Sequence, residues 1–156
     1  EGPKVIEFNA RFGDPEAMNV LTLLQNGFLD VCQGVADGRL SKDAPFLRKA
    51  TVCKYVVPAG YGTESKAGRP VLVNEKKLAD TGARLYYAAV DEKDGVVMTT
   101  SSRTLGVVGM ADSIEEAEAI CEAGLAHVQG EVFVRHDIGK RELVRRRVEH
   151  MRQVRG

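Results

Sequence analysis

The sequence changes character near residue 50, and this change limits the folds that the chain can adopt. From Ala50 onward, short β-branched and aromatic runs alternate with glycine, which is the pattern of a small, mostly β module. Asp94-Gly95 stands between two of these runs and predicts a hairpin turn, because both residue types tolerate the positive φ that tight turns require. The runs that we expect to be strands are residues 51–57, 71–73, 84–90, 96–100, 104–109 and 132–134.

Helical signals lie before the β runs. Residues 28–36 repeat apolar side chains at helical spacing, and so does the stretch that follows Asp14-Pro15. We expect Asp14 to be the N-cap and Pro15 the first helical residue, because Asp accepts free backbone N–H groups and Pro has none to satisfy. Asn26-Gly27 separates the two predicted helices, and a polar stretch over residues 41–45 follows the second.

Two more helices are expected after the β runs. Ser113 and Glu116 form a capping-box pattern, in which each side chain satisfies a backbone N–H group of the other residue. The apolar face of this helix includes Cys121, which we expect in the core. A last helix is expected from about Lys140. The sequence therefore predicts an α+β chain, with a boundary near residues 40–50 that divides it into parts 1–48 and 49–156.

Composition fits a globular chain of one domain or two small ones. The 156 residues include 22 Lys plus Arg and 22 Asp plus Glu, and 44% are hydrophobic, which is enough apolar material for a core. No apolar run approaches the roughly 20 residues that cross a bilayer, and the N-terminus lacks a signal-peptide pattern. Three cysteines fit neither a disulfide framework nor a metal knuckle, so we expect a cytoplasmic location.

Polar side chains alternate along the first residues, where residues 4–8 are expected to form a strand. On a strand, Glu7, Asn9 and Arg11 would project from one face. Carboxylate and amide oxygens are hard ligands suited to Mg²⁺, and a guanidinium takes phosphate charge bidentately. The same alternation is typical of a solvated strand edge, so the residues alone leave both interpretations open.

The full string from Glu7 to Glu16, Glu-x-Asn-x-Arg-Phe-Gly-Asp-Pro-Glu, resembles the metal-binding strand of the ATP-grasp ligases. Its second half is similar to that of one family within them, the phosphoribosylamine–glycine ligases, also called glycinamide ribonucleotide synthetases. Residues 103–108, 113–117 and 132–139 resemble later elements of this family, in the same order. The resemblance implies the end of an ATP-grasp core, a strand plus helices, followed by a small β-rich C-terminal domain with two helices.

The resemblance also implies a function. Members of this family use ATP to join glycine to 5-phosphoribosylamine in purine biosynthesis, through a glycyl phosphate intermediate. In this sequence Glu7 and Asn9 match the Mg²⁺ or Mn²⁺ ligands, and Arg11 matches the catalytic arginine. Asp14, Pro15 and Glu16 match the turn beside the amino-acid substrate, where Asp14 would orient the glycine ammonium. A plain helix cap at Asp14 explains that residue equally well.

The sequence departs from the family pattern at two places and in its extent. The loop over residues 59–68 lacks the spacing of a phosphate-binding loop, so we expect a turn there. Ser101-Ser102 stands where the family often has a pair of glycines before the arginine, which leaves the role of Arg103 open. The family's N-terminal substrate domain and nucleotide clamp have no room before Glu1. We therefore expect that the chain needs the N-terminal part of the same enzyme as its partner, and that it has no ligase activity alone.

A second class of function remains as an alternative. Residues 135–156 hold eight Lys or Arg and three acidic residues, so the alternative is a small domain whose basic last helix binds nucleic acid or another polyanion. Apolar residues on one face of that helix, and the lack of aromatics, favour docking against protein instead. The arginines concerned are Arg145, Arg146, Arg147, Arg152 and Arg155. His127, His136 and His150 fall on different elements, which predicts ordinary surface or hydrogen-bonded histidines rather than a zinc site or a triad.

Overall fold

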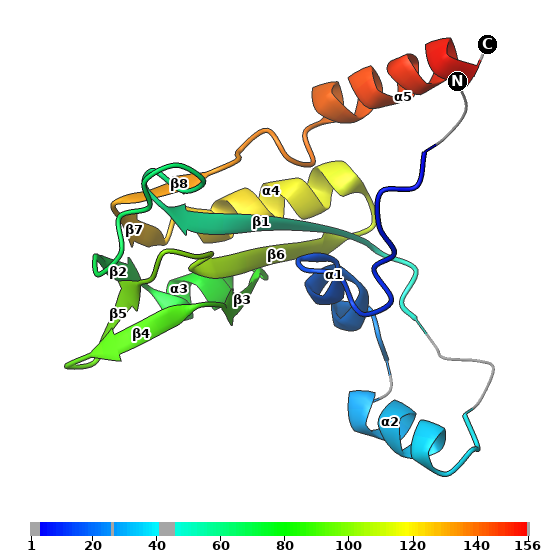
Figure 1. The fold of residues 1–156 in the computed structure, drawn as a ribbon, viewed down its shortest axis with the longest axis horizontal. Helices are drawn as coiled ribbons and strands as arrows, with labels where there is room; N and C mark the ends of the chain where they lie inside the picture. The colour runs from blue at the N-terminus through cyan, green and yellow to red at the C-terminus, as the bar shows by residue number, and fades with distance from the viewer. Residues whose placement is uncertain (1–3, 26, 41–45, 156) are drawn as a thin grey trace. The chain divides into compact units, whose positions relative to one another are not determined.

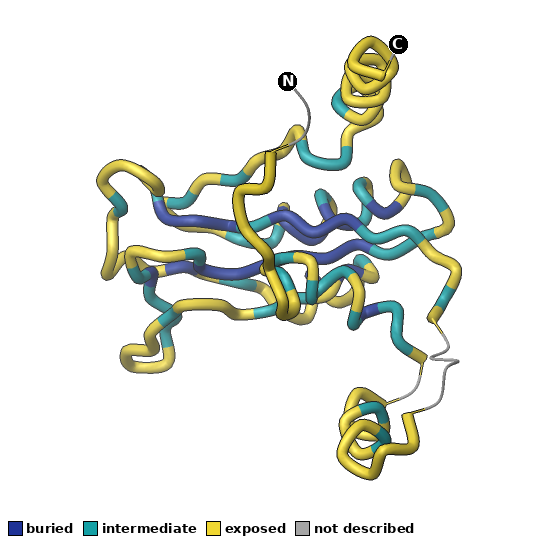
Figure 2. Tube along the Cα trace, turned by 45° about the vertical axis from the view of Figure 1, so that its right-hand side comes forward, coloured by how far each residue is buried: buried dark blue, intermediate teal, exposed yellow. Residues whose placement is uncertain are grey.

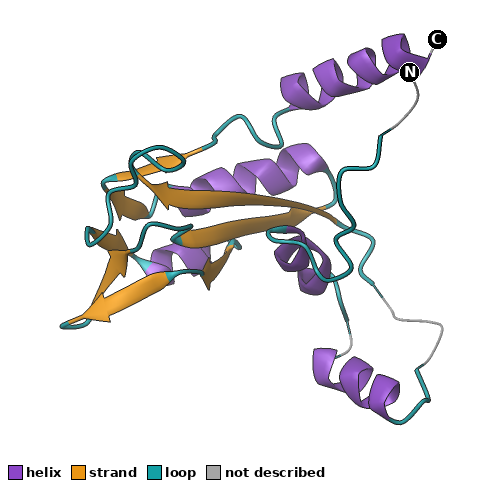
Figure 3. Ribbon diagram, viewed as in Figure 1, coloured by secondary structure: helices purple, strands orange, loops and turns teal. Residues whose placement is uncertain are grey.

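The computed structural model describes residues 4–25, 27–40 and 46–155 (Figure 1). The chain divides into two compact units, Glu1–Phe46 and Leu47–Gly156. The chain combines helices with antiparallel sheets, which confirms the α+β class (Figure 3). The predicted turn at Asn26 and the polar stretch over residues 41–45 fall at least partly outside the described residues.

The first unit contains two short helices, α1 (Glu16–Thr22) and α2 (Phe28–Ala36). The helix predicted over residues 28–36 is confirmed with the same bounds. The strand predicted over residues 4–8 is wrong, because residues 4–10 belong to no helix or strand. A strand is defined by hydrogen bonds to a neighbouring strand, and no other described residue supplies them here.

The start of α1 also differs from the prediction. The N-cap is Pro15 with φ −93° and the first helical residue is Glu16, so Asp14 is not the N-cap and Pro15 is not the first helical residue. The Asp14-Pro15 bond is cis. Backbone carbonyls provide the first turn's acceptors instead, since Gly13 O accepts from Ala17 N at 2.8 Å. The helix therefore begins one residue later than the cap pattern indicates.

The second unit contains two antiparallel four-stranded sheets, with orders β3-β6-β1-β8 and β4-β5-β2-β7. In the first sheet the central strands β6 and β1 are longer than the edge strands, whereas all strands of the second sheet are short (Figures 1 and 3). The strand bounds are β1 (Ala50–Pro58), β2 (Pro70–Val73), β3 (Arg84–Tyr87), β4 (Val90–Lys93), β5 (Val96–Thr99), β6 (Leu105–Ala111), β7 (Val128–Gly130) and β8 (Val132–Val134).

Six connections move the chain from one sheet to the other, and two short ones, of two residues and one residue, were not predicted. The single strand expected over residues 84–90 is wrong, because the chain leaves β3 after Tyr87 and enters β4 at Val90 in the other sheet. The second crossing runs from β7 to β8 at Gly130, whose φ of 155° favours glycine. The predicted hairpin is confirmed between β4 and β5, where Asp94 and Gly95 have φ of 53° and 77°.

Three helices belong to this unit, where two were expected: α3 (Glu75–Asp80), α4 (Ile114–Leu125) and α5 (Arg141–Arg155). The predicted capping box is confirmed at α4, with Glu116 N donating to Ser113 Oγ at 3.2 Å and Ser113 N donating to a Glu116 carboxylate oxygen at 3.2 Å. No described helix is long and apolar enough to pass through a lipid bilayer.

The core of the second unit lies between α4 and the strands β1 and β6 (Figure 2). Cys121 of α4 is fully buried, as predicted, and its thiol donates to Val107 O at 3.1 Å. Burial raises the pKa of this thiol to about 12, so the group stays protonated and acts as a core residue. The other buried members of the cluster are Val52, Val56, Val71, Leu78, Ala83, Leu105, Val107, Ala117 and Leu125.

One glycine sets how closely α4 approaches the sheet. A Cβ added at Gly109 of β6 would overlap Ala117 O and lie 2.7 Å from Cys121 N, both in the backbone of α4. We predict that Gly109→Ala lowers the free energy of unfolding by about 1–3 kcal/mol or more, because the helix must move off the strand. Gly34→Ala is the control, since its added Cβ would make only ordinary contacts of 3.5 Å or more. Equal stability of the two variants in urea unfolding would contradict the prediction.

Candidate functional site

The residues predicted to hold a metal lie close together in the first unit. Asn9 Nδ2 donates to Glu7 Oε1 at 3.1 Å, so the amide and the carboxylate are within reach of one ion. Both side chains are exposed. Only the Asn9 amide nitrogen faces Glu7, so ion binding requires a rotation of the amide that presents Oδ1 instead. With that rotation, the two groups supply the hard oxygen donors that Mg²⁺ and Mn²⁺ accept.

The remaining predicted site residues surround the turn into α1. Arg11 is exposed, and its guanidinium donates to Phe12 O at 3.4 Å. The Glu16 carboxylate folds back over Gly13, where an added Cβ would overlap it. Asp14 and Pro15 form the cis peptide bond directly before the helix. The structure thus places all six predicted residues within one largely exposed segment of ten residues, and Glu7 and Asn9 are in direct contact there.

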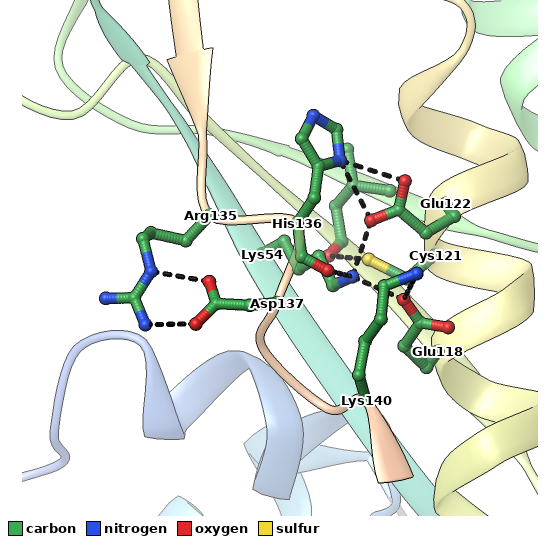
Figure 4. Close-up of polar contacts among 9 residues, drawn as sticks. Lys54, Glu118, Cys121, Glu122, Arg135, His136, Asp137 and Lys140 are labelled. Carbon is green, nitrogen blue, oxygen red and sulfur yellow. Dashed lines mark hydrogen bonds and ion pairs between the residues drawn. The ribbon is translucent and has the colours of Figure 1, made fainter. Parts of the chain in front are cut away.

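The second unit contains a polar cluster that the sequence analysis missed, built around Lys54 of β1. The Lys54 side chain is fully buried and donates three hydrogen bonds, to Glu118 Oε1 at 2.7 Å, Glu122 Oε1 at 2.5 Å and His136 O at 3.0 Å (Figure 4). Every N–H group of the ammonium therefore has an acceptor. A lone lysine inside the apolar run from Val52 to Val57 was the only sequence signal for this cluster.

Two further contacts connect the cluster to the segment after β8. His136 Nδ1 lies 2.9 Å from a Glu122 carboxylate oxygen, and Lys140 Nζ lies 3.4 Å from Glu118 Oε1 (Figure 4). The prediction that His136 is a hydrogen-bonded or surface histidine is therefore confirmed. Among the described residues, no group of three or more His, Cys, Asp or Glu side chains is arranged to hold a metal.

Charges in the cluster shift the pKa values of its members. Burial alone would lower the pKa of Lys54, but the hydrogen bonds to Glu118 and Glu122 overcome this effect and raise it. Burial alone would raise the pKa of Glu122, but the hydrogen bonds from Lys54 and His136 lower it. Both shifts favour the ionised forms, so Lys54 and Glu122 form a partly buried, hydrogen-bonded ion pair.

Arg135 and Asp137 form an exposed ion pair on the same segment. Arg135 donates from Nε and from one terminal nitrogen to the two Asp137 oxygens, each at 2.6 Å (Figure 4). This bidentate bond lowers the pKa of Asp137 to about 2. Arg103, whose role the sequence left open, lies over the Tyr55 ring at 5.1 Å from its centroid.

A shallow depression lies between the second sheet and α3. Its volume is about 560 Å³, and both polar and apolar side chains line it. His127, Asn74 and Lys77 are the groups in it that could bind an anion, but Asn74 already caps α3 by accepting from Lys77 N at 3.1 Å. None of the residues predicted from motifs lines this depression.

We predict that Lys54→Met lowers the free energy of unfolding by about 3–5 kcal/mol, because two partly buried carboxylates lose their counter-charge. Lys49→Met is the matched control: Lys49 pairs with exposed Asp112 at 2.6 Å, and such surface pairs contribute about 0–1 kcal/mol. Urea unfolding of both variants at pH 7 checks the expectation. Similar midpoints for the two variants would show that the cluster is not a stabilising element.

The pKa shifts also give the cluster a pH dependence. Glu122 has a lowered pKa in the folded chain, so its contribution is complete above the ordinary carboxyl pKa of 4.5 and is lost as the pH falls through the folded value. Lys54 has a raised pKa, so its contribution is complete below 10.5 and is lost as the pH rises through the folded value. The stability difference between wild type and Lys54→Met should therefore be constant from about pH 5 to 10 and shrink in acid.

Comparison with known proteins identifies relatives along the whole chain. Residues 51–141 match the family model described as phosphoribosylglycinamide synthetase, C domain. The phosphoribosylamine–glycine ligase of Methanothermobacter thermautotrophicus is 53% identical over 155 residues, and that of Methanocella arvoryzae is 55% identical over 157 residues. The alignments cover 99% and 100% of this chain and 35% of each relative. The chain thus spans about a third of the length of the curated relatives it matches.

A solved structure with the same name has a similar fold. The crystal structure of phosphoribosylamine–glycine ligase from Thermotoga maritima aligns with a TM-score of 0.71 and 26% sequence identity. The alignment covers 86% of this chain and 33% of that one. Sequence and structure comparisons therefore agree on the same relatives.

Proposed function

The chain belongs to the phosphoribosylglycinamide synthetase C-domain family, and from this premise we propose that it is the C-terminal part of an ATP-dependent ligase joining glycine to 5-phosphoribosylamine. One observation carries the proposal: relatives named for this activity are more than half identical to the chain over almost all of its residues. The product would be glycinamide ribonucleotide, and the reaction would belong to purine biosynthesis. The complete enzyme would work in the cytoplasm.

The proposed reaction has two steps. The glycine carboxylate attacks the γ-phosphoryl group of ATP, which gives glycyl phosphate and ADP. The amine of 5-phosphoribosylamine then attacks the glycyl carbonyl carbon, and inorganic phosphate leaves as the amide forms. Positioning and charge stabilisation supply most of the catalysis in phosphoryl transfer, so the residues that matter are those that hold phosphate oxygens and the amino acid in place.

Residues of the first unit would perform these tasks. Glu7 and Asn9 would hold Mg²⁺ or Mn²⁺ through one carboxylate and one amide oxygen, and their 3.1 Å contact supports a shared ion. The ion would shield phosphate charge during transfer. Arg11 would donate to the oxygens of the transferring phosphoryl group. Asp14 would accept from the glycine ammonium, and Pro15 and Glu16 would shape the turn beside it.

The exposed apolar surface of the first unit supports a covalent partner, the N-terminal part of the same enzyme. Only Thr22 is buried among the described residues of this unit, and ten large hydrophobic side chains are exposed, including Ile6 at 95% and Phe8 at 88%. Such a surface is far more apolar than a free domain tolerates. Residues 4–10 would gain their strand partners from the preceding sheet of the complete enzyme.

We predict that Glu7→Gln in the complete protein lowers the rate of glycine- and phosphoribosylamine-dependent ADP formation by at least about 100-fold, because charge stabilisation at the phosphoryl oxygens is lost. Asn9→Ala should raise the metal concentration needed for half-maximal rate. Glu92→Gln, which changes an exposed glutamate on β4, is the control and should match wild type.

The wild-type chain of residues 1–156 alone should form no ADP. Absence of glycine-dependent turnover in the complete wild-type protein would refute the proposed function.

The role of Asp14 separates a substrate contact from a structural one. Asp14→Asn in the complete protein should raise KM for glycine about tenfold, because the charged acceptor of the ammonium is removed, and should leave KM for ATP unchanged. Asp30→Asn, in the first turn of α2, is the control. A lower melting temperature with an unchanged glycine KM would assign Asp14 to the structure of the turn instead.

A further inference from the structure

Helix α5 presents an apolar stripe that nothing in the described part of its unit covers. The helix has 15 residues and none is buried. Val144, Val148 and Met151 follow one another at spacings of four and three, which places them on one face. They are 38%, 45% and 44% exposed, and Val154 beyond them is 65% exposed. An amphipathic helix with this pattern normally buries its stripe against another element.

Contacts to the rest of the unit hold the segment directly before α5, whereas no residue of the helix itself is buried. Lys140, directly before the helix, lies 3.4 Å from Glu118, and Lys54 holds the carbonyl of His136 a few residues earlier. Isolated helices of about 15 residues are only marginally stable in water, and most helical stability in proteins comes from packing of an apolar face. A partner for the stripe would therefore supply the stability that α5 lacks on its own.

The relatives indicate where such a partner is found. The family model ends at residue 141, the first residue of α5. The alignments with the archaeal ligases cover 99–100% of this chain, so they continue through α5, and about two thirds of each relative lies outside the match. Helix α5 thus lies beyond the C domain proper, in proteins that possess a large additional body.

The charge of α5 restricts the kind of surface that fits it. The helix carries six arginines and two glutamates, so a second copy of α5 would be repelled. Arg147 and Arg152 lie on the two sides of the stripe, which suits an apolar surface with acidic residues at its rim. Nucleic acid would be attracted by the arginines but offers nothing to Val144, Val148 and Met151, and α5 has no aromatic side chain on which bases could stack.

We propose that α5 docks its Val144–Val148–Met151 stripe on an apolar, acid-rimmed surface of the preceding part of the same polypeptide. This inference rests on the proposed function only in that the complete protein has the length of its relatives. Docking would connect the Lys54 cluster, through the short segment before α5, to the body that holds the nucleotide. The C domain would then be attached to that body at both of its ends.

Hydrogen exchange of the complete protein tests the docking. Amides of α5 should exchange at least about tenfold more slowly in wild type than in Val148→Asp, because opening of the helix requires undocking. Gln153→Asp is the matched control, since it adds the same charge on the opposite face of the helix and should exchange like wild type. Equal exchange of α5 in wild type and Val148→Asp would overturn the proposal.

Two other outcomes would also overturn it, and both are distinguishable. Protection that appears only as the measured mass doubles with concentration would assign the stripe to a second copy. Protection that appears only after addition of a single-stranded RNA oligonucleotide at low salt would assign α5 to nucleic acid. Ligase activity of the same wild-type sample is measured separately. An active enzyme whose α5 amides exchange rapidly would contradict the docking proposal alone. An inactive protein whose α5 amides exchange slowly would contradict the proposed function alone.

Discussion

The buried ammonium of Lys54 is the interaction on which the second unit depends. A buried charge is tolerated only when it is paired and fully hydrogen-bonded, and Lys54 meets this condition with three acceptors from two separate parts of the chain. Glu118 and Glu122 are one turn apart on α4, and His136 follows β8. All three hydrogen bonds of the ammonium therefore form only when β1, α4 and the segment after β8 are in place together.

This requirement fixes the register of β1 against α4. Val52, Lys54 and Val56 occupy alternate positions of β1 and therefore share the face toward α4. The two valines belong to the apolar cluster and lie before and after Lys54 along the strand. A shift by one residue would place Cys53 or Tyr55 opposite the two carboxylates and turn Lys54 away from them. Gly109 makes the arrangement possible, because only a residue without a side chain lets α4 approach β6 closely enough for Glu118 and Glu122 to reach Lys54.

Local signals predicted the elements that local interactions determine. The capping box at Ser113, the turn at Asp94-Gly95 and the helix Phe28–Ala36 were each readable from a few neighbouring residues. The crossing between β3 and β4 was not, because no breaker marks it and each half pairs with a strand far along the chain. The Lys54 cluster was missed for the same reason, since its partners lie more than 60 residues away.

For the candidate site, the sequence motif indicated the residues, but the predicted local structure was wrong. Its six residues came from one continuous string, so a family resemblance identified them without any knowledge of long-range pairing. The strand that was expected to carry them is absent, because a strand requires neighbours and the described residues provide none for residues 4–10. The unit with the motif thus buries almost nothing, and the unit with the core lacks the motif. Under the proposed function this division has a physical explanation. Residues 7–16 would lie at the junction with the larger body of the enzyme, where a neighbouring sheet would order Glu7, Asn9 and Arg11 around the nucleotide.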